Sequence, residues 1–341
     1  MRVLVTGTDG YIGALLAPLL RARGHEVVGL DTGFYRDGWL YGVRVPQTQI
    51  RKDVRAITEE ELRGFDGIVH LAELSNDAIG QHDPDLTRQI NHRGSVALAR
   101  KAKAAGVSRF IYSSSCSVYG TGSDDFKTEE SALNPQTTYA ECKVLAERDI
   151  APLADETFAP TFLRNATAFG ASPRMRFDIV LNNLAGLAWT TGEIAMTSDG
   201  TPWRPLAHVL DIGEAMACAL EAPAEAMRGE IFNVGDNGQN YRVREIAEIV
   251  GAVFTGCAVT FGTSDGDNRS YRVAFDKIGR HLPDFRCRRD VTFGARELRD
   301  IFARIALSPE AFAFRAHTRV KQLEHLLRTG QVEADLTWRA A

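Results

Sequence analysis

The sequence has no long apolar run, no paired cysteines and little net charge, and each of these absences excludes a class of protein. No apolar run is long enough to cross a bilayer, and we expect no signal peptide before the first apolar segment. The five cysteines include no Cys-x-x-Cys pair and no zinc-ligand spacing, so we expect neither a disulfide framework nor a metal site. The net charge is only −4, which indicates no nucleic-acid or membrane partner. A reduced, cytoplasmic protein is the simplest expectation.

The pattern on which the rest depends lies at the N-terminus. Residues 2–6 form an apolar strand pattern, Gly7, Gly10 and Gly13 follow, and a helical pattern begins after them. A strand, a glycine turn and a helix in this order are typical of a dinucleotide-binding site. The glycines allow a tight turn and leave room for the pyrophosphate, and the N–H groups at the start of the helix face the negative charge of the phosphates. Tyr11 and Ile12 lie in the same turn and are assigned to the cofactor with the glycines.

Acidic residues at the ends of the next predicted strands indicate which dinucleotide the site would bind. Asp31 closes a strand predicted at 26–30, where a carboxylate can bind both ribose hydroxyls and repel a 2′-phosphate, so the pattern favours NAD over NADP. Asp53 and Val54 follow a short strand predicted at 49–52 and could meet the adenine, although Asp53 could equally be a loop acid. Leu71 and Ala72 end the strand predicted at 67–72 and are assigned to the cofactor.

Strands and helices alternate along the first half, which predicts an α/β fold with a doubly wound parallel sheet of the Rossmann type. We expect an NAD-binding domain over residues 1–170 and a smaller mixed α/β substrate domain over 171–341, with chain crossings between them and a helical C-terminal tail. Further strands are predicted at 109–113, 160–164 and 230–234, and helices at 84–105, 139–154, 177–189, 212–220 and 243–253.

A tyrosine and a lysine four residues apart carry the predicted chemistry. Tyr139 and Lys143 lie on one face of a predicted helix, where the ammonium lowers the pKa of the phenol for proton exchange with a sugar hydroxyl. Such a pair is common on solvated helix surfaces. Three serines, Ser113 to Ser115, at the end of the fifth predicted strand make the catalytic interpretation stronger, because a hydroxyl there would lie at the nicotinamide.

Together these motifs resemble the extended short-chain dehydrogenase/reductases, which include nucleotide-sugar epimerases, dehydratases and ketoreductases. The resemblance covers the chain to about residue 285 and implies the catalytic trio Ser115, Tyr139 and Lys143, with Ser115 chosen because it precedes Tyr119 by four residues. It also implies Asn91 as the support of the lysine and a homodimer formed through the helices at 84–105 and 138–154. The resemblance implies substrate or cofactor contacts for Ser113, Asn183, Arg204 and Arg269.

Several positions depart from the family pattern. Cys116 and Ser117 replace the Asp-Glu pair of the family's 4,6-dehydratases, and Cys116 is either a substrate contact and acid or a buried thiol. Thr167 stands where the family has asparagine and is retained as a substrate contact, while Asn165 falls two residues early. Glu73 stands where a small residue is usual and could be an extra acid or base, or a charge at the rim. His70 and His208 are interpreted as strand packing.

The residues favour an NAD-dependent epimerase of a nucleotide-diphosphate sugar, which oxidises a ring carbon, most simply C4, and returns the hydride to the other face. This mechanism needs no Asp-Glu pair at 116–117. The alternatives are a nucleotide-keto-sugar reductase of deoxysugar formation and an atypical dehydratase that uses Cys116 or Glu73. A non-catalytic NAD-sensing protein is a further alternative, but it does not require Tyr139 or Lys143.

Overall fold

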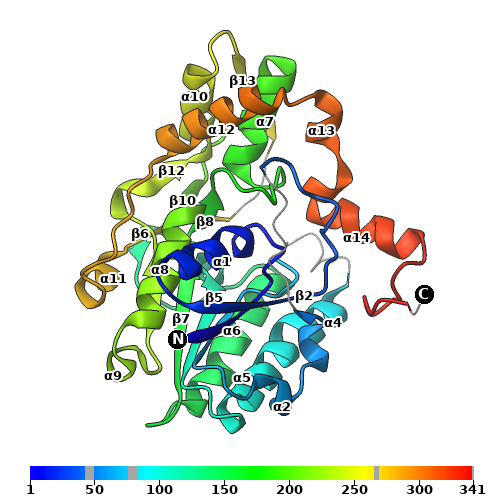
Figure 1. Ribbon diagram of the computed structural model, residues 1–341. Coiled ribbons are helices and arrows are strands. Elements are labelled where there is room, and N and C mark those ends of the chain that lie inside the picture. Colours follow the sequence, from blue (N-terminus) through cyan, green and yellow to red (C-terminus); the bar gives the residue numbers. More distant parts are fainter. Residues whose placement is uncertain (43–49, 76–82, 265–268, 340–341) are drawn as a thin grey trace.

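A seven-stranded parallel sheet forms the centre of the computed structural model, which describes residues 1–42, 50–75, 83–264 and 269–339 (Figure 1). Its strand order is β11-β7-β5-β4-β1-β2-β3, so the predicted Rossmann-type sheet is confirmed. The strands read as continuous apolar runs because both faces are covered. They are β1 (Arg2–Thr6), β2 (Glu26–Asp31), β3 (Ile50–Arg51), β4 (Gly67–His70), β5 (Arg109–Ser115), β7 (Ala159–Asn165) and β11 (Ile231–Val234).

Alternate residues of each strand serve the two faces of the sheet. Val3 and Val5 of β1 belong to one apolar cluster with helices α1 (Gly13–Ala22) and α8 (Val209–Glu221). Leu4 belongs to another, with α5 (Ser95–Ala104) and α6 (Thr138–Ile150). Shorter segments complete this half: α2 (Glu59–Leu62), α4 (Pro84–Thr87), α9 (Ala224–Met227), α11 (Asp276–His281), η1 (Val54–Ala56), η3 (Cys116–Tyr119) and η4 (Ala151–Leu153).

Elements from beyond residue 170 lie with the large sheet. β11 pairs with β7 at its edge, and α8 covers one face beside α1. The chain therefore returns to the large sheet after residue 170.

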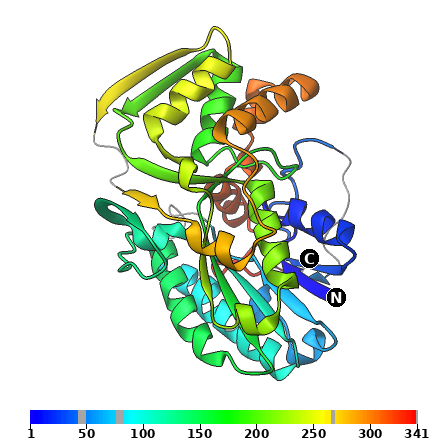
Figure 2. The same cartoon turned by 90° about the vertical axis from the view of Figure 1, so that its left-hand side faces the viewer.

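The other half is built on three small sheets and three packed helices, above the large sheet in Figure 2. The elements are β6 (Thr121–Lys127), β8 (Thr167–Phe169), β9 (Glu193–Ser198), β10 (Trp203–His208), β12 (Asn240–Arg242), β13 (Ala258–Ser264) and β14 (Ser270–Val273), with α7 (Val180–Thr191), α10 (Val243–Val253), α12 (Val291–Ile305) and η5 (Asn237–Gln239). Apolar side chains of α7, α10 and α12 pack together in one buried cluster of this half.

Several element bounds differ from those predicted. The helix predicted at 84–105 consists of α4, a π-helical turn η2 (Arg88–Gly94) and α5. The helix predicted from residue 177 begins only at Val180, because Phe177 packs against Phe302 and Ile179 is extended. β5 continues to Ser115 because it pairs with β7 up to Asn165. Residue 49, predicted in the third strand, lies outside the described residues.

The C-terminal tail returns to the first half of the chain. Ala306 ends α12 in a left-handed conformation, and Ser308 caps α13 (Pro309–Ala313) by accepting a hydrogen bond from Ala311 N. The turn η6 (Arg315–His317) and α14 (Arg319–Arg328) then run down beside the large sheet (Figure 1). Among the residues that the structure describes, no helix combines the length and apolar character that a membrane span requires.

Candidate active site

The glycine turn is packed too closely to hold side chains. Gly7 has a φ of +77°, which favours glycine, and its N–H donates to Leu30 O at 2.7 Å. A Cβ on Gly13, where α1 begins, would lie 2.1 Å from Gly7 O, and one on Gly10 would lie 3.0 Å from the same oxygen. This is the backbone cradle that a pyrophosphate needs at a helix start, so the residues present fit NAD.

Asp31 ends β2 beside this turn. Its carboxylate accepts hydrogen bonds from Asp9 N at 3.0 Å and Gly33 N at 2.7 Å. Burial, together with the nearby charge of Asp9, raises the pKa of Asp31 to about 6. Asp53 forms an ion pair with Arg55 at 2.7 Å and caps η1, whose first residue is Val54.

One cavity of about 830 Å³ joins the glycine turn to the carboxyl ends of the strands. It is the location that open α/β sheets provide for ligands. The predicted site residues that line it are Gly7, Gly10, Tyr11, Ile12, Gly13, Asp31, Asp53, Val54, Leu71, Ala72, Ser113, Ser115, Tyr139, Lys143, Thr167, Asn183, Arg204 and Arg269.

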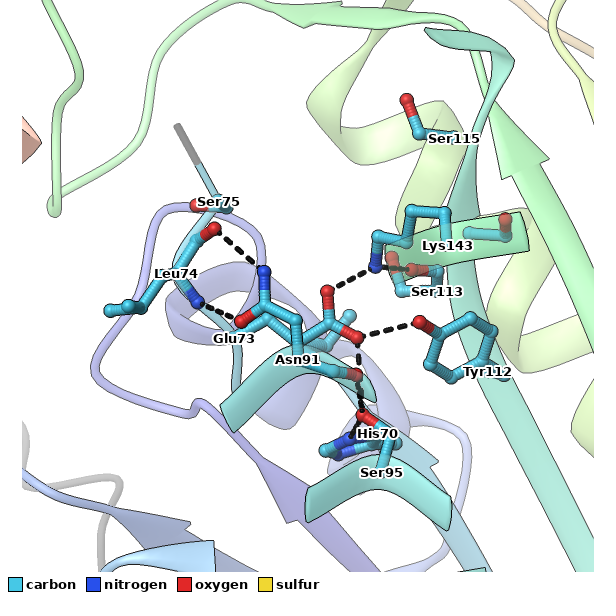
Figure 3. A network of polar contacts seen from close by, with 12 residues as sticks. His70, Glu73, Leu74, Ser75, Asn91, Ser95, Tyr112, Ser113, Ser115 and Lys143 are labelled. Atoms are coloured by element: carbon cyan, nitrogen blue, oxygen red, sulfur yellow. Dashed lines mark hydrogen bonds and ion pairs between the residues drawn. The ribbon is translucent and has the colours of Figure 1, made fainter. Parts of the chain in front are cut away.

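The predicted trio lies in the same cavity. Tyr139 and Lys143 are one turn apart on α6, and the Nζ of Lys143 lies 5.4 Å from the centroid of the Tyr139 ring. Lys143 also donates a hydrogen bond to the backbone oxygen of Ser113, the residue two before Ser115 on β5. The Oγ of Ser115 accepts from Ser117 N at 3.1 Å, which sets the turn at the strand end. Figure 3 shows Ser113, Ser115 and Lys143 around one space.

Glu73 contacts the lysine directly, and the suggestion of a rim charge is wrong. Its Oε2 lies 2.5 Å from Lys143 Nζ, and the side chains of Lys143 and Glu73 are 4% and 3% exposed. The other carboxylate oxygen accepts from Tyr112 Oη at 2.7 Å (Figure 3). This carboxylate is therefore part of the cavity wall, not of its entrance.

Asn91 does not line the cavity, contrary to its assignment as a cofactor residue and support of the lysine. Its Nδ2 donates to Leu74 O at 3.0 Å, and its Oδ1 accepts from Leu74 N at 2.8 Å. These two bonds occupy the amide on the backbone that follows Glu73 (Figure 3). The π-helical turn η2 presents Asn91 to that backbone, and a sequence pattern of helical period does not reveal such a turn.

Cys116 is also not brought to the cavity. Its side chain is 1% exposed within the core, and its Sγ lies 3.1 Å from Arg164 O. Burial raises the pKa of this thiol far above its ordinary value. The assignment of Cys116 as a substrate contact or acid is therefore wrong, and the alternative of a buried thiol agrees with the structure.

The polar residues predicted at the substrate end are held by backbone contacts. Asn183 donates to Phe177 O at 3.0 Å, and Arg204 donates to the backbone oxygens of Trp203 and Arg269. Asn165, which precedes the expected position by two residues, bonds Ser113 Oγ at 3.0 Å and lines the cavity. Two arginines at one wall suit a diphosphate, because guanidinium groups pair with phosphate oxygens.

Sequence reasoning missed the charged residues at the tail side of the cavity. Arg176 and Asp178 form an ion pair of 2.9 Å there. Arg319, at the start of α14, places its guanidinium carbon 3.9 Å from the centroid of the Tyr35 ring and lines the same wall. No local motif marks Arg319 as a residue of the cavity, because Tyr35, which it contacts, lies at the other end of the chain.

The tail is attached to the loop after β2 by both apolar and polar contacts. Leu323 and Leu326 share a buried cluster with Phe34, Leu74 and Leu86. Three hydrogen bonds reinforce it, from Gln322 Nε2 to Phe34 O at 2.9 Å, from Trp338 Nε1 to Thr32 O at 2.7 Å and from Arg55 to Asp335 O at 2.9 Å. The tail thus forms a wall at the Asp31 end of the cavity.

Both histidines named from the sequence have packing roles. His70 bonds Thr6 and Ser95, and burial lowers its pKa to about 3. His208 pairs with Glu297 at 2.9 Å. Within the described ranges, no group of three His, Cys, Asp or Glu side chains could hold a metal ion.

The chain is similar to a described family and to individual proteins within it. The model of the NAD-dependent epimerase/dehydratase family matches residues 3–235. The chain is 31% identical over 264 residues to a UDP-glucose 4-epimerase of Corynebacterium glutamicum and 32% over 272 residues to one of Mycolicibacterium smegmatis, with about three quarters of this chain and 79% and 83% of those proteins covered.

Solved structures extend the likeness. A UDP-glucose 4-epimerase from Stenotrophomonas maltophila, with bound NAD and formylated UDP-arabinopyranose, superposes with a TM-score of 0.75 at 26% identity, over 89% of this chain and 99% of that one. The dTDP-glucose 4,6-dehydratase DesIV from Streptomyces venezuelae, with NAD, gives 0.75 at 25% identity, over 89% and 98%. The chain therefore belongs to the NAD-dependent epimerase/dehydratase family, and its enzymatic cofactor is NAD.

Proposed function

We propose that the protein is an NAD-dependent epimerase of a nucleotide-diphosphate sugar that inverts a ring carbon, most simply C4. The observation that carries the proposal is the shared cavity, in which Tyr139, Lys143 and Ser115 lie together with the glycine turn and Asp31. The related UDP-glucose 4-epimerases support the same reaction.

Each residue has a role that its chemistry dictates. The phenol of Tyr139 takes the proton of the ring hydroxyl, and the ammonium of Lys143 stabilises the phenolate that this requires. Ser115 Oγ hydrogen-bonds the same sugar oxygen, while Arg204 and Arg269 hold the diphosphate. Bound NAD would supply the means to take up and return a hydride at the sugar carbon. The glycine backbone and Asp31 would hold the pyrophosphate and ribose of the cofactor.

The two alternative reactions have less support. A dehydratase must remove a proton from carbon and protonate a leaving hydroxyl, but the Cys116 thiol is buried outside the cavity and Glu73 is paired with Lys143. A ketoreductase must exchange its oxidised cofactor after each turnover, and Asp31 disfavours the 2′-phosphate of NADPH. An epimerase needs neither an additional acid–base pair for elimination nor exchange of its cofactor after each turnover.

The test is turnover by the protein as purified, with no cofactor added. UDP-glucose and the corresponding GDP, CDP and dTDP sugars, deuterated at C4, are each offered and the products analysed by mass and NMR. We expect one of them to give its C4 epimer with the deuterium retained and without net NAD reduction. A product lighter by one water would establish the dehydratase instead. In a second assay with a nucleotide-keto-sugar and added NADPH, stoichiometric oxidation of NADPH would establish the reductase.

Retention of the cofactor should depend on the tail. Leu326 is 2% exposed within the cluster that attaches α14, whereas its neighbour Leu327 is 40% exposed. Leu326→Ala should loosen the tail, because truncating a buried leucine costs about 2–5 kcal/mol, and should lower the NAD found per protein after gel filtration. Leu327→Ala is the matched control and should retain NAD. Equal NAD content in both variants, with the tail of Leu326→Ala cut faster by protease, would refute the role of the tail.

We further propose that the protein is a homodimer. The supporting observation is that α5 and α6 pack against each other on the same face of the sheet. These are the two helices through which the family resemblance implies a dimer. Light scattering should give about twice the mass of the 37.5 kDa chain, and a monomeric mass would overturn this proposal.

A further inference from the structure

The wall behind Lys143 carries a group that the proposed mechanism does not use. Glu73 follows β4, and the trio comes from β5 and α6, so the sheet brings together residues separated by 70 positions. Oε2 of Glu73 meets Lys143 Nζ at 2.5 Å, while Oε1 accepts from Tyr112 Oη at 2.7 Å and lies 3.3 Å from Ser95 Oγ. Glu73 therefore forms a buried ion pair with Lys143 and accepts a hydrogen bond from Tyr112.

The hydrogen bonds of the side chains behind Glu73 can be followed from donor to acceptor. Thr6 Oγ1 accepts from two backbone N–H groups at 3.1 Å, so its own proton points to His70 Nδ1 at 2.7 Å. The neutral imidazole then carries its proton on Nε2 and donates to Ser95 Oγ at 2.9 Å. The single serine proton then goes to Asn91 O at 2.6 Å, and the contact of Ser95 Oγ with Glu73 Oε1 is longer, at 3.3 Å. The groups that face the Glu73 carboxylate most closely are thus the Tyr112 hydroxyl, which donates to it, and the Lys143 ammonium, which forms an ion pair with it (Figure 3).

A fully buried lysine needs such a partner to keep its charge. Burial alone lowers the pKa of Lys143, but the carboxylate of Glu73 and the phenol of Tyr139 outweigh it and raise the pKa above its ordinary value. The amide of Asn91, which the family resemblance assigns to the lysine, is occupied by Leu74. Those bonds fix the backbone of the residue next to Glu73.

We propose, on the basis of the function above, that Glu73 is a positioning residue for the reaction. Its carboxylate holds the ammonium of Lys143 against the Ser113 carbonyl and keeps it cationic beside the Tyr139 phenol. Glu73 is thus neither the acid nor the base of a second reaction. It acts only through the lysine.

Other charged groups around the pair do not replace it. Burial raises the pKa of Tyr112 well above its ordinary value and that of Cys142 to about 12, so neither ionises near neutral pH. His70 is neutral there because burial lowers its pKa to about 3. Arg176 pairs with Asp178 at 2.9 Å, and Arg88 pairs with Glu141 at 3.2 Å. Glu147 pairs with Arg164 at 2.7 Å.

The test is the pH dependence of kcat for Glu73→Gln, which keeps the shape and removes the charge. Without the carboxylate, the ammonium of Lys143 is lost at lower pH, so the alkaline limb of the profile should move down by about one to three pH units. KM for the nucleotide sugar should change little, since Glu73 acts through Lys143. Glu73→Asp, which keeps a charge farther from Nζ, should give a smaller shift in the same direction.

Glu147→Gln is the matched control, because it also removes a buried carboxylate from an ion pair but lies outside the cavity. Its alkaline limb should coincide with that of the parent. An unmoved limb in Glu73→Gln, or in Glu73→Asp if only that variant folds, would overturn the inference.

A direct measurement separates this inference from the proposed function. If the parent epimerises no nucleotide sugar, the proposed function fails. The ε-carbon NMR signal of Lys143, assigned by its loss from Lys143→Arg, still reports the charge of the lysine in the NAD-loaded protein. It should titrate at lower pH in Glu73→Gln than in the parent, and equal midpoints would refute the role of Glu73 independently of turnover.

Discussion

Tyr139→Phe should reduce kcat by about 10² to 10⁴-fold, the range expected when a positioned acid–base group is removed. The change deletes one oxygen and leaves the ring that stands 5.4 Å from the ammonium of Lys143. The folded protein and its NAD content should therefore be retained while proton transfer from the sugar hydroxyl is lost. Turnover under saturating substrate, measured beside the unfolding temperature and the NAD per protein, checks this expectation.

The matched control is Tyr241→Phe. The hydroxyl of Tyr241, on β12, donates to Oε1 of Gln239 in the turn η5 at 3.0 Å, and Tyr241 does not line the cavity. Its removal deletes the same atom from the same residue type, so kcat should stay within about two-fold of the parent, because no proton of the reaction passes through it. Undiminished turnover in Tyr139→Phe would show that the phenol is not the catalytic group.

Gly13→Ala should abolish cofactor binding and destabilise the first half of the chain. The added Cβ would lie 2.1 Å from Gly7 O and 2.8 Å from the Thr8 Cα, and neither backbone atom can move without opening the turn. Overpacking of this kind costs about 1–3 kcal/mol or more. The opened turn would no longer present its N–H groups to a pyrophosphate, so NAD content should fall to the background level.

Gly279→Ala supplies the comparison, since Gly279 lies within helix α11 and a Cβ there meets nothing within 4 Å. Alanine is favoured over glycine in a helix by about 0.8–1.0 kcal/mol, so this variant should be as stable as the parent or more stable. Calorimetry and the NAD released on denaturation measure both effects. Normal NAD content in Gly13→Ala would mean that the glycine turn does not hold the cofactor.

Local patterns in the sequence predicted the parts of the site that follow a strand or lie on one helix. The turn from Gly7 to Gly13, Asp31 at the end of β2, and the Tyr139–Lys143 pair on α6 are each readable within a few residues, because strand ends and helix faces have fixed periods. The same periods predicted the parallel sheet, since alternating strands and helices leave few other arrangements.

Tertiary structure decided the partners of these residues. The glutamate that pairs with Lys143, the amide of Asn91 that turns to Leu74, the burial of Cys116, and the tail that brings Arg319 to the cavity all join segments far apart in the chain. The position of a residue in the local periodic pattern determines which face of a helix or strand it occupies. Whether a carboxylate meets an ammonium or water depends on which distant surface packs against that face, and only the folded chain determines that.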